Sequence, residues 1–498
     1  MQLQFDKMPI SCLKSLKREP QSQEQTQEFR ISDGMPDIGR IVGAWGQVIL
    51  RSKEWRGDSI AVSGGTMVWV QYLPEGGGQT QCVETWLPFQ MNWSIPPTQR
   101  DGVIHTECFL CGVDARSTSA RKMMIRSNVS VLATVMEKQE VEVFSPGDMP
   151  KDIQLQKHTY PVSLLAEAGE KALHLEETLQ LPPSAPKIEK LYGYSLIPEI
   201  VEEKRMVDKL VFRGNGVLHL QYLSDDGGQY TWDFELPFTQ YAELEQEYSE
   251  NAGTMVLPSV TALELDLEAD QLKVKAGLVC QYQITDQTMV EVVTDAYSTL
   301  RAVEPVKQPL ELSGILETKV QTLRPQINIS LDMMRLTDVQ FLPQCVHTRT
   351  TGDTVTLEIP GQFQVLYYDM EGQLHTTLQR WEDTVTMPAG ENCCVQVTVT
   401  PIAKPQGNIT PGNTQLSAEL IITVQTISGE GIPMVTGLDA DQIQKPDPRR
   451  PSLILLTPGQ KDLWQLAKEY GSTVDAIRNA NHLQDAPDPS KVLLIPVL

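Results

Sequence analysis

A threefold internal repeat is the feature that most limits how this chain can fold. The copies share a tyrosine, at Tyr72, Tyr222 and Tyr367, so successive copies are 150 and 145 residues apart. A repeat of this length predicts one structural unit that is used three times. The aligned segments are 62–78, 212–228 and 357–373.

In each copy the tyrosine closes a stretch of alternating residues. The second copy shows this in Leu218, Leu220 and Tyr222, and a turn of glycines and acids follows at 225–228. Alternation with a period of two predicts a half-buried strand, and the turn predicts a hairpin. The corresponding residues are Val68, Val70 and Tyr72 with turn 75–78 in the first copy, and Phe363, Val365 and Tyr367 with turn 369–372 in the third.

Later in the second copy, Leu263, Leu265 and Leu267 alternate with acidic residues. One apolar and one charged face are typical of an antiparallel sheet packed on one side. Helical periodicity is scarce before residue 455. The predicted fold class is therefore mainly β: three tandem β-sandwich or barrel-like repeat domains, followed by a small α/β module.

Proline-rich and polar joints, at 146–152, 182–187 and 444–451, interrupt these patterns. We expect the last of them to be the sharpest boundary. The predicted organisation is a polar N-terminal segment at 1–29, β domains at 30–158, 159–302 and 303–440, a linker at 441–451 and a C-terminal module at 452–498.

Charge and composition exclude several classes of protein. The chain has 41 Lys and Arg against 64 Asp and Glu, a net charge of −23, and residues 161–310 alone hold 25 acids and 11 bases. Such a chain is not expected to bind nucleic acid or an anionic membrane, because both need basic surface. No apolar run reaches the ~18 residues of a membrane span. A polar N-terminus and eight scattered cysteines predict a cytoplasmic protein with free thiols.

The last 47 residues change pattern and predict a strand–helix–helix–strand module. A short apolar strand at 453–456 precedes Leu463, Leu466, Ala467 and Tyr470, whose spacing places them on one helix face. Gly471 is expected to end this helix, and Thr473 to cap a second one that carries Val474 and Ile477. An apolar stretch at 492–495 supplies the closing strand.

This module resembles a LysM domain. The resemblance rests on Pro458-Gly459, Asp462-Leu463-Trp464, Leu466-Ala467, Tyr470-Gly471, Asn481 and Leu494-Ile495-Pro496. It implies a shallow groove for N-acetylglucosamine polymers, formed by the loops at 458–461 and 486–490. The family's usual Gly-Asp-Thr-Leu turn is one residue longer here, which alters the backbone that would meet a sugar. The candidate residues for binding a partner or a glycan are Pro458, Gly459, Gln460, Lys461, Asp462, Asp488, Pro489 and Ser490.

The repeats carry a second resemblance. The motif Asp295-Ala296-Tyr297-Ser298, the hairpin at Tyr222 and Leu236-Pro237-Phe238 resemble the SPOCS domain of spore-coat proteins. With the C-terminal module, the whole chain is similar to the SipL type of spore coat morphogenetic protein. That resemblance implies work in the mother-cell cytoplasm, at the forespore outer surface and spore coat. It also implies a partner, the coat scaffold ATPase called stage IV sporulation protein A.

Enzyme chemistry finds little support in the sequence. His105, Cys108 and Cys111 could suggest a metal or redox site, but no second CxxC pair exists and burial is the favoured interpretation. No HExxH, phosphate-binding loop or nucleophile elbow is present. We therefore expect no catalytic residue, cofactor or metal. The alternative to a morphogenetic scaffold is a LysM protein of the cell wall or a phage tail that binds peptidoglycan, and cellular location distinguishes the two.

Overall fold

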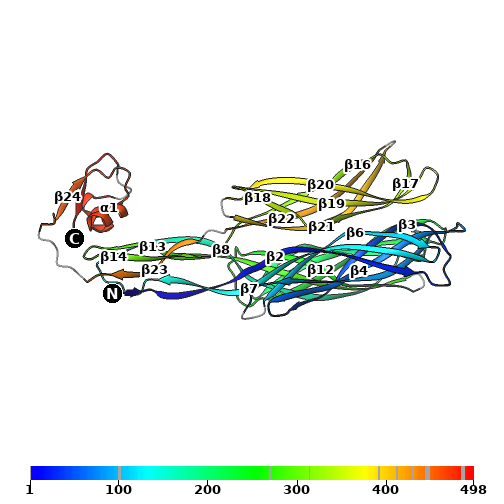
Figure 1. The fold of residues 1–498 in the computed structure, drawn as a ribbon, viewed down its shortest axis with the longest axis horizontal. Coiled ribbons are helices and arrows are strands. Elements are labelled where there is room, and N and C mark those ends of the chain that lie inside the picture. Colours follow the sequence, from blue (N-terminus) through cyan, green and yellow to red (C-terminus); the bar gives the residue numbers. More distant parts are fainter. Residues whose placement is uncertain are drawn as a thin grey trace.

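The computed structural model is mainly β, with 75% of residues in strands and two short helices near the C-terminus (Figure 1). This confirms the predicted mainly β class and the strand–helix–helix–strand order of the last residues. The structure describes residues 2–98, 102–268, 271–312, 314–390, 393–410, 413–428, 431–442, 449–483 and 488–498.

The first unit consists of two three-stranded antiparallel sheets. One has the order β3-β4-β5 and the other β2-β7-β6, so the first and last strands of the unit pair with each other. The bounds are β2 (Asp6–Arg30), β3 (Ile38–Trp55), β4 (Ser59–Pro74), β5 (Gln81–Ser94), β6 (Val103–Ser119) and β7 (Lys122–Ser145).

The second unit repeats this connectivity, with sheets β9-β10-β11 and β8-β13-β12. Its bounds are β8 (Ile153–Leu179), β9 (Ile188–Arg205), β10 (Lys209–Ser224), β11 (Gln229–Glu243), β12 (Gly253–Glu268) and β13 (Gln271–Ser298).

The third unit keeps the same order but divides two of its strands. β17 and β18 together occupy one side of β19, and β15 and β16 together occupy one side of β22. The bounds are β15 (Ile315–Leu323), β16 (Gln326–Ile329), β17 (Met333–Pro343), β18 (His347–Thr351), β19 (Thr354–Asp369), β20 (Leu374–Pro388), β21 (Cys393–Thr410) and β22 (Asn413–Ser428).

The repeated tyrosines lie in the central strands β4, β10 and β19, each of which forms the predicted hairpin with the next strand. The expected apolar face is buried in all three copies, and Tyr367 is the one partly buried member. The opposite face is buried as well, and there it carries polar side chains such as Gln71, His219 and Gln364. The half-buried strand expected from the alternation is therefore covered on both sides.

The polar segment at 1–29 is part of the first unit. Residues 6–30 form β2, which pairs with β7 along its whole length, from Asp6 opposite Ser145 to Arg30 opposite Lys122. The first unit therefore begins at residue 6 and not at residue 30. The sequence analysis missed this strand because most of its residues are polar, and apolar residues alternate only over the short stretch Met8, Ile10 and Cys12.

The other predicted boundaries fall at different places in the fold. Residue 159 lies inside β8, which begins directly after the joint at 146–152, and the joint at 182–187 is a loop within the second unit. Residue 303 begins β14 (Val303–Leu310) and residue 440 ends β23 (Ile432–Ala440), so the third range matches strand limits. Most of the expected linker, residues 443–448, lies outside the described residues.

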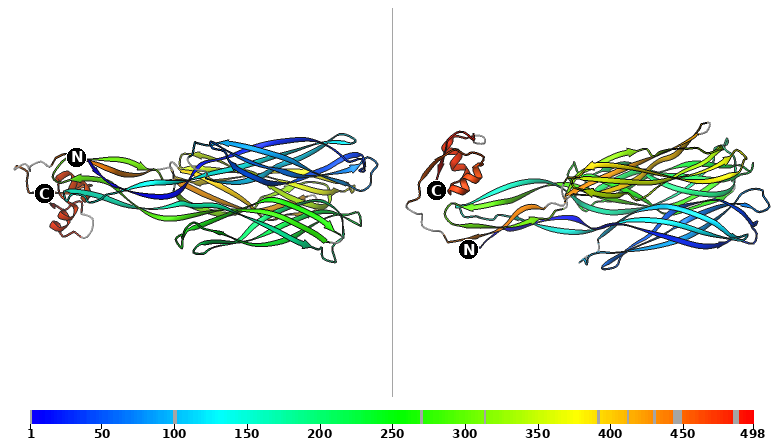
Figure 2. Two further views of the ribbon diagram at one scale, coloured as in Figure 1. Left: turned by 90° about the horizontal axis from the view of Figure 1, so that it is seen from below. Right: turned by 45° about the horizontal axis from the view of Figure 1, so that its top comes forward.

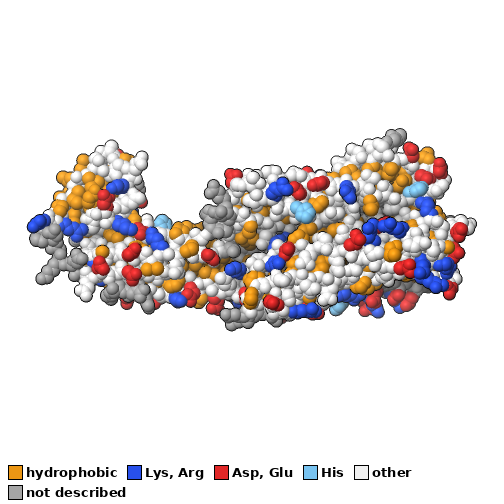
Figure 3. Space-filling view, viewed as in Figure 1, with side chains coloured by type: hydrophobic (Ala, Val, Ile, Leu, Met, Phe, Trp, Pro, Cys, Tyr) orange, Lys and Arg blue, Asp and Glu red, His pale blue; other side chains and the backbone are white. Residues whose placement is uncertain are grey.

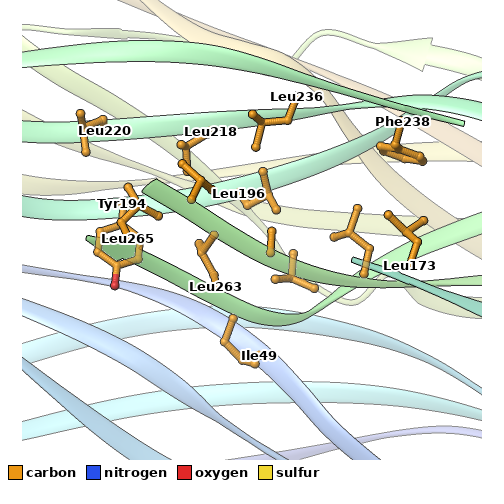
Figure 4. Close-up of a cluster of buried hydrophobic side chains, with 14 of the residues drawn as sticks. Ile49, Leu173, Tyr194, Leu196, Leu218, Leu220, Leu236, Phe238, Leu263 and Leu265 are labelled. Carbon is orange, nitrogen blue, oxygen red and sulfur yellow. The ribbon is translucent and has the colours of Figure 1, made fainter. Parts of the chain in front are cut away.

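The three units pack side by side around one axis and do not form a linear row. β3 contacts β12, β9 contacts β21, and β17 contacts β6. The second strand of each unit (β3, β9 or β17) therefore meets the fifth strand of a neighbouring unit (β12, β21 or β6). The apolar cores interlock in consequence. Ile49 of the first unit is fully buried among Leu196, Leu263 and other core residues of the second (Figure 4).

A stalk extends from one end of this three-unit body (Figure 2). It consists of the outer ends of the pairs β2–β7 and β8–β13 and of a third sheet, in which β23 pairs with β14 and with β1 (Gln2–Gln4). Each repeat thus contributes one antiparallel pair. Residues from all three pairs fill its core, including Val141, Val292 and Met434.

Deleting residues 1–29 tests the assignment of β2. The deletion removes an edge strand and exposes β7, which carries the buried residues Ile125 and Val131. We expect the truncated chain to aggregate, or to lose several degrees of melting temperature, because exposed sheet edges and apolar faces associate. Differential scanning calorimetry and light scattering measure both effects. A truncated chain with the melting temperature of the full chain contradicts the assignment.

Candidate functional site: the C-terminal module on the stalk

The first helix of the C-terminal module, residues 452–498, ends at the residue that the sequence predicted. α1 (Leu463–Tyr470) begins at a capping box, in which the Asp462 side chain accepts a hydrogen bond from the Gln465 backbone. It ends at Gly471, whose φ of 61° is left-handed and suits glycine. On the expected face Leu463, Leu466 and Ala467 are buried and Tyr470 is partly buried, with Ile477 of the next helix completing the core.

The second helix is tied to the closing strand by one asparagine. α2 (Val474–Asn481) begins with the Thr473 hydroxyl accepting from the Ala476 N–H at 3.0 Å. At its end, the Asn481 side chain accepts from the Leu494 N–H (2.7 Å) and donates to the Leu494 carbonyl (2.6 Å). This pair of bonds fixes α2 against β25 (Leu493–Pro496), which pairs with β24 (Leu453–Leu456).

The candidate binding loops are on the surface of this module. Gly459, Gln460, Lys461, Asp462, Asp488, Pro489 and Ser490 are exposed, and Pro458 is buried. Each loop is held by its own turn. The Lys461 N–H donates to the Pro458 carbonyl, and Asp488 accepts from the backbone and hydroxyl of Ser490. Among the described residues, no hydrogen bond or ion pair joins the two loops. Residues 486 and 487 of the second loop lie outside the described residues.

The module is seated on the outer end of β13. Trp464 of α1 packs edge-on against Tyr297, with 4.8 Å between ring centroids, and its indole N–H donates to Asp295 at 2.9 Å. The Tyr297 hydroxyl donates to the Ser472 carbonyl, also at 2.9 Å. Lys468 adds an ion pair to Asp295 at 2.7 Å. We call these contacts of Trp464, Lys468 and Ser472 with Asp295 and Tyr297 the seat. The segment 295–298, whose motif contributes to the SPOCS resemblance, therefore also holds the module.

Burial and nearby charges shift the pKa of two residues of the seat, Tyr297 and Asp295. Burial raises the pKa of Tyr297 to about 12, so its hydroxyl stays protonated as a donor. Burial alone would raise the pKa of Asp295, but hydrogen bonds from Lys468 and Trp464 and the charges of Lys468 and Lys307 lower it. An ionised Asp295 is thus the acceptor for both α1 side chains. Sequence reasoning missed this contact because nothing local links residue 295 to residue 464.

A second group of polar residues lies between the second and third units, with His219, Gln221 and Asp338 buried and the side chains of Asp233 and Lys404 about one-third exposed. His219 lies between two carboxylates: Nδ1 is 2.6 Å from Asp233 and Nε2 is 3.1 Å from Asp338. Gln221 donates to Asp338 at 2.6 Å, and Lys404 pairs with Asp233 at 3.0 Å. Burial opposes the charged imidazole, but the charge of Asp338 and both hydrogen bonds raise the pKa of His219 to about 9. For Asp338, burial is likewise outweighed and its pKa falls to about 2.

Of the residues considered as a metal or redox site, His105 is buried and Cys108 and Cys111 are partly buried. His105 is bonded to the Gly169 carbonyl and to Gln283, and burial lowers its pKa to about 3, so it is neutral. Burial raises the pKa of the Cys108 and Cys111 thiols to about 12 and about 11. In the described part of the chain, no three His, Cys, Asp or Glu residues are placed to hold a metal ion. Neither described helix has the length and apolar character needed to cross a membrane.

Comparison of the chain with protein-family models, with curated proteins and with solved structures found no match.

Substituting Asp295 tests the seat. Asp295→Ala removes the acceptor for Trp464 and Lys468, and hydrogen bonds to charged groups are worth about 1.5–3 kcal/mol each. We expect the module to detach while the β body keeps its melting temperature. Small-angle scattering should show a broader distribution of dimensions, and the Trp464 indole N–H resonance should shift. The control Arg478→Ala, on the exposed side of α2, should change neither. An unchanged scattering profile for Asp295→Ala contradicts the seat.

The buried cluster predicts a pH-dependent stability. The contribution of His219 is fully present below its usual pKa of about 6.5 and is lost as the pH rises through about 9. That of Asp338 is present above about 3.8 and is lost as the pH falls toward 2. Between pH 6.5 and 9.5, the free energy of unfolding should fall by as much as about 3 kcal/mol, since one pKa unit corresponds to about 1.4 kcal/mol. Urea unfolding of the full chain and of His219→Gln separates this loss from other titrations. Equal pH dependence in both proteins would refute it.

Proposed function

We propose that this protein is a non-catalytic morphogenetic scaffold of endospore coat and cortex assembly. In this proposal the C-terminal module, a LysM-type domain, docks the coat scaffold ATPase of the stage IV sporulation protein A type. The observation that carries the proposal is the position of the module. Its seat uses Trp464, Lys468 and Ser472, whereas all but one of the candidate loop residues are exposed and none of them takes part in the hydrogen bonds and ion pair of the seat.

The exposed loops suit a protein partner better than a deep small-molecule site. They present charges of both signs, at Lys461, Asp462 and Asp488, on backbone held by tight turns. Preformed polar surfaces of this kind give orientation and specificity, while each contact stays weak. Several copies gathered on an assembling coat would then add avidity without a new contact.

The three-unit body suits a scaffold because its units are packed together through apolar cores. Three interlocked cores and a shared stalk set the distance between the module and the far end of the body (Figure 1). Buried free thiols at Cys12, Cys82, Cys280 and Cys345 fit a reducing compartment, in agreement with the mother-cell cytoplasm that the family resemblance implies. The proposed location is the forespore outer surface and the spore coat.

Co-purification with the coat scaffold ATPase tests the docking role. We expect deletion of 452–498 to abolish co-purification while residues 1–451 remain folded. Substituting the exposed loop residues Gln460, Lys461, Asp488 and Ser490 by alanine should weaken it about tenfold or more and leave the module folded, since these side chains face solvent. Arg478→Ala serves as the matched control. Full yield from the truncated chain would assign docking to the β units instead.

Glycan binding separates this proposal from a wall-binding LysM protein. The first loop is one residue longer than the family pattern, and its turn at Gly459 has a left-handed φ of 60°. We expect calorimetry with chitin oligomers to show no binding or only millimolar affinity. Micromolar affinity, or a tagged protein on the vegetative wall or in the medium, supports the alternative.

A further inference from the structure

The two-stranded sheet of the C-terminal module is apolar on both of its faces. β24 and β25 pair antiparallel, and neither strand contains a charged residue. Ile454, Leu456, Leu493 and Ile495 pack into the core of the module, together with residues of both helices. Because side chains alternate along a strand, the residues between these four face the opposite way. The sheet therefore has a second apolar face, which the helices do not cover.

This second face forms a continuous apolar surface. The register places Leu453 opposite Pro496 and Leu455 opposite Leu494, so the four side chains are neighbours on one side of the sheet. Val492, two residues before Leu494, extends the alternation. Leu453, Leu455 and Val492 are 46%, 66% and 61% exposed, and Leu494 and Pro496 are partly buried. We call these five side chains the outer sheet face. Exposed apolar side chains that gather in this way indicate an interaction surface.

The outer sheet face offers no charged group with which to orient a charged partner. Lys491, next to Val492, pairs with Asp488 at 3.7 Å. Arg450, three residues before Leu453, donates to backbone carbonyls of the stalk and the module. The surface that best matches an uncharged apolar face is another of the same kind, because neither side then has to bury a charge.

The distribution of charge along the chain favours a second copy meeting at this module. Residues 452–498 hold four Lys or Arg and five Asp or Glu, a net charge of −1, whereas residues 1–451 hold 37 and 59, a net charge of −22. Two acidic bodies repel each other, and salt screens this repulsion beyond a Debye length of about 10 Å at 0.1 M. The nearly neutral module is therefore the part at which two copies approach with the least repulsion.

The outer sheet face also lies on the free side of the module. The seat is formed by Trp464, Lys468 and Ser472, which belong to α1 and the turn after it. β24 lies farther from the three-unit body than α1 does (Figures 1 and 2). Apolar side chains gather on the module in Figure 3. Packing of two outer sheet faces against each other would thus leave the two acidic bodies apart.

We propose that the outer sheet face binds the same face of a second copy, so that two chains form a symmetric dimer through their C-terminal modules. A two-fold axis brings identical side chains together, which is the commonest arrangement in homodimers. The two sheets stack about 10 Å apart, as packed sheets do. This contact uses the sheet and not the loops proposed to dock the coat scaffold ATPase, so it goes beyond the proposed function.

The size of the outer sheet face sets the strength of the dimer. Five side chains per copy bury less than the ~1,200–2,000 Å² of a stable interface. We therefore expect a dissociation constant on the order of 0.1 mM. Where many copies gather on one surface, as the proposed function requires, the high local concentration keeps such a weak contact occupied.

Sedimentation velocity of the purified full chain tests this inference, over a concentration range that extends tenfold to either side of ~0.1 mM. We expect monomer to convert to dimer as the concentration rises. Added salt should strengthen the dimer, because it screens the repulsion between the acidic bodies and does not weaken apolar contacts. A chain that stays monomeric over the whole range, or a dimer that dissociates in salt, would overturn the proposal.

Substitutions on the outer sheet face locate the contact. Leu455→Lys places a charge at its centre and should weaken dimerisation at least tenfold. Val201→Lys, at a side chain that is 70% exposed in the second unit, is the matched control and should leave the dimer unchanged. Mixing Leu455→Lys with Leu455→Glu should restore part of the association, because opposite charges then meet across the two-fold axis.

The Trp464 indole N–H resonance reports whether the module of each variant stays folded and seated. If Leu455→Lys loses this resonance, Val492→Lys gives the same test from outside the two strands. A dimer of full strength in a folded variant would place the contact elsewhere. A monomeric parent chain whose Leu455→Lys variant no longer co-purifies with the coat scaffold ATPase would assign the outer sheet face to that partner, and the proposal would be wrong.

Discussion

The packing of three β units around one axis is the contact on which the rest of this structure depends. A six-stranded sandwich of two three-stranded sheets leaves strand edges and outer faces that need cover. Here each unit covers its neighbour, and Ile49 and Phe109 of the first unit enter the cores of the second and third. The outer faces of β4, β10 and β19 become interior surfaces, and their polar side chains find partners across the units. Gln364, for example, donates to the Ala44 carbonyl at 2.6 Å.

Burying charge between units has a cost and gives specificity. The attraction between two buried charges offsets their desolvation free energy only when their geometry is good. Removing one partner leaves an uncompensated buried charge, which strongly destabilises the fold. His219 between Asp233 and Asp338 satisfies that condition for one arrangement of the second and third units. We infer that the cluster selects this arrangement over alternatives that the similar repeats could adopt, because Asp233 belongs to the same unit as His219 whereas Asp338 is supplied by the third unit.

The stalk links the body to the C-terminal module. β8 and β13 are 27 and 28 residues long, and they continue past the body until Asp295 and Tyr297 reach the stalk's end. Figure 3 shows the module projecting beside the stalk, with apolar and charged side chains on the face in view. The same strands therefore close the second core and hold the module. A change in the body that tilted β13 would move the module and its loops with it.

What the sequence determined by itself was local. The tyrosine hairpins follow from residues within twenty positions of one another, and so do the end of the first helix at Gly471 and the start of the second at Thr473, because caps, turns and alternation are short-range effects. The candidate loop residues were placed on the module surface on the same basis. Strand β2 was missed because most of this edge strand is polar and its apolar residues alternate only over a short stretch.

Only the tertiary structure decided how the units meet. The seat joins Asp295 to Trp464, and the polar cluster joins His219 to Asp338. The cavity where the three units meet is lined by side chains from all of them. Each of these contacts spans more than a hundred residues. Its energy comes from burial and charge compensation between surfaces that local sequence patterns describe separately, so no pattern within one repeat could specify it.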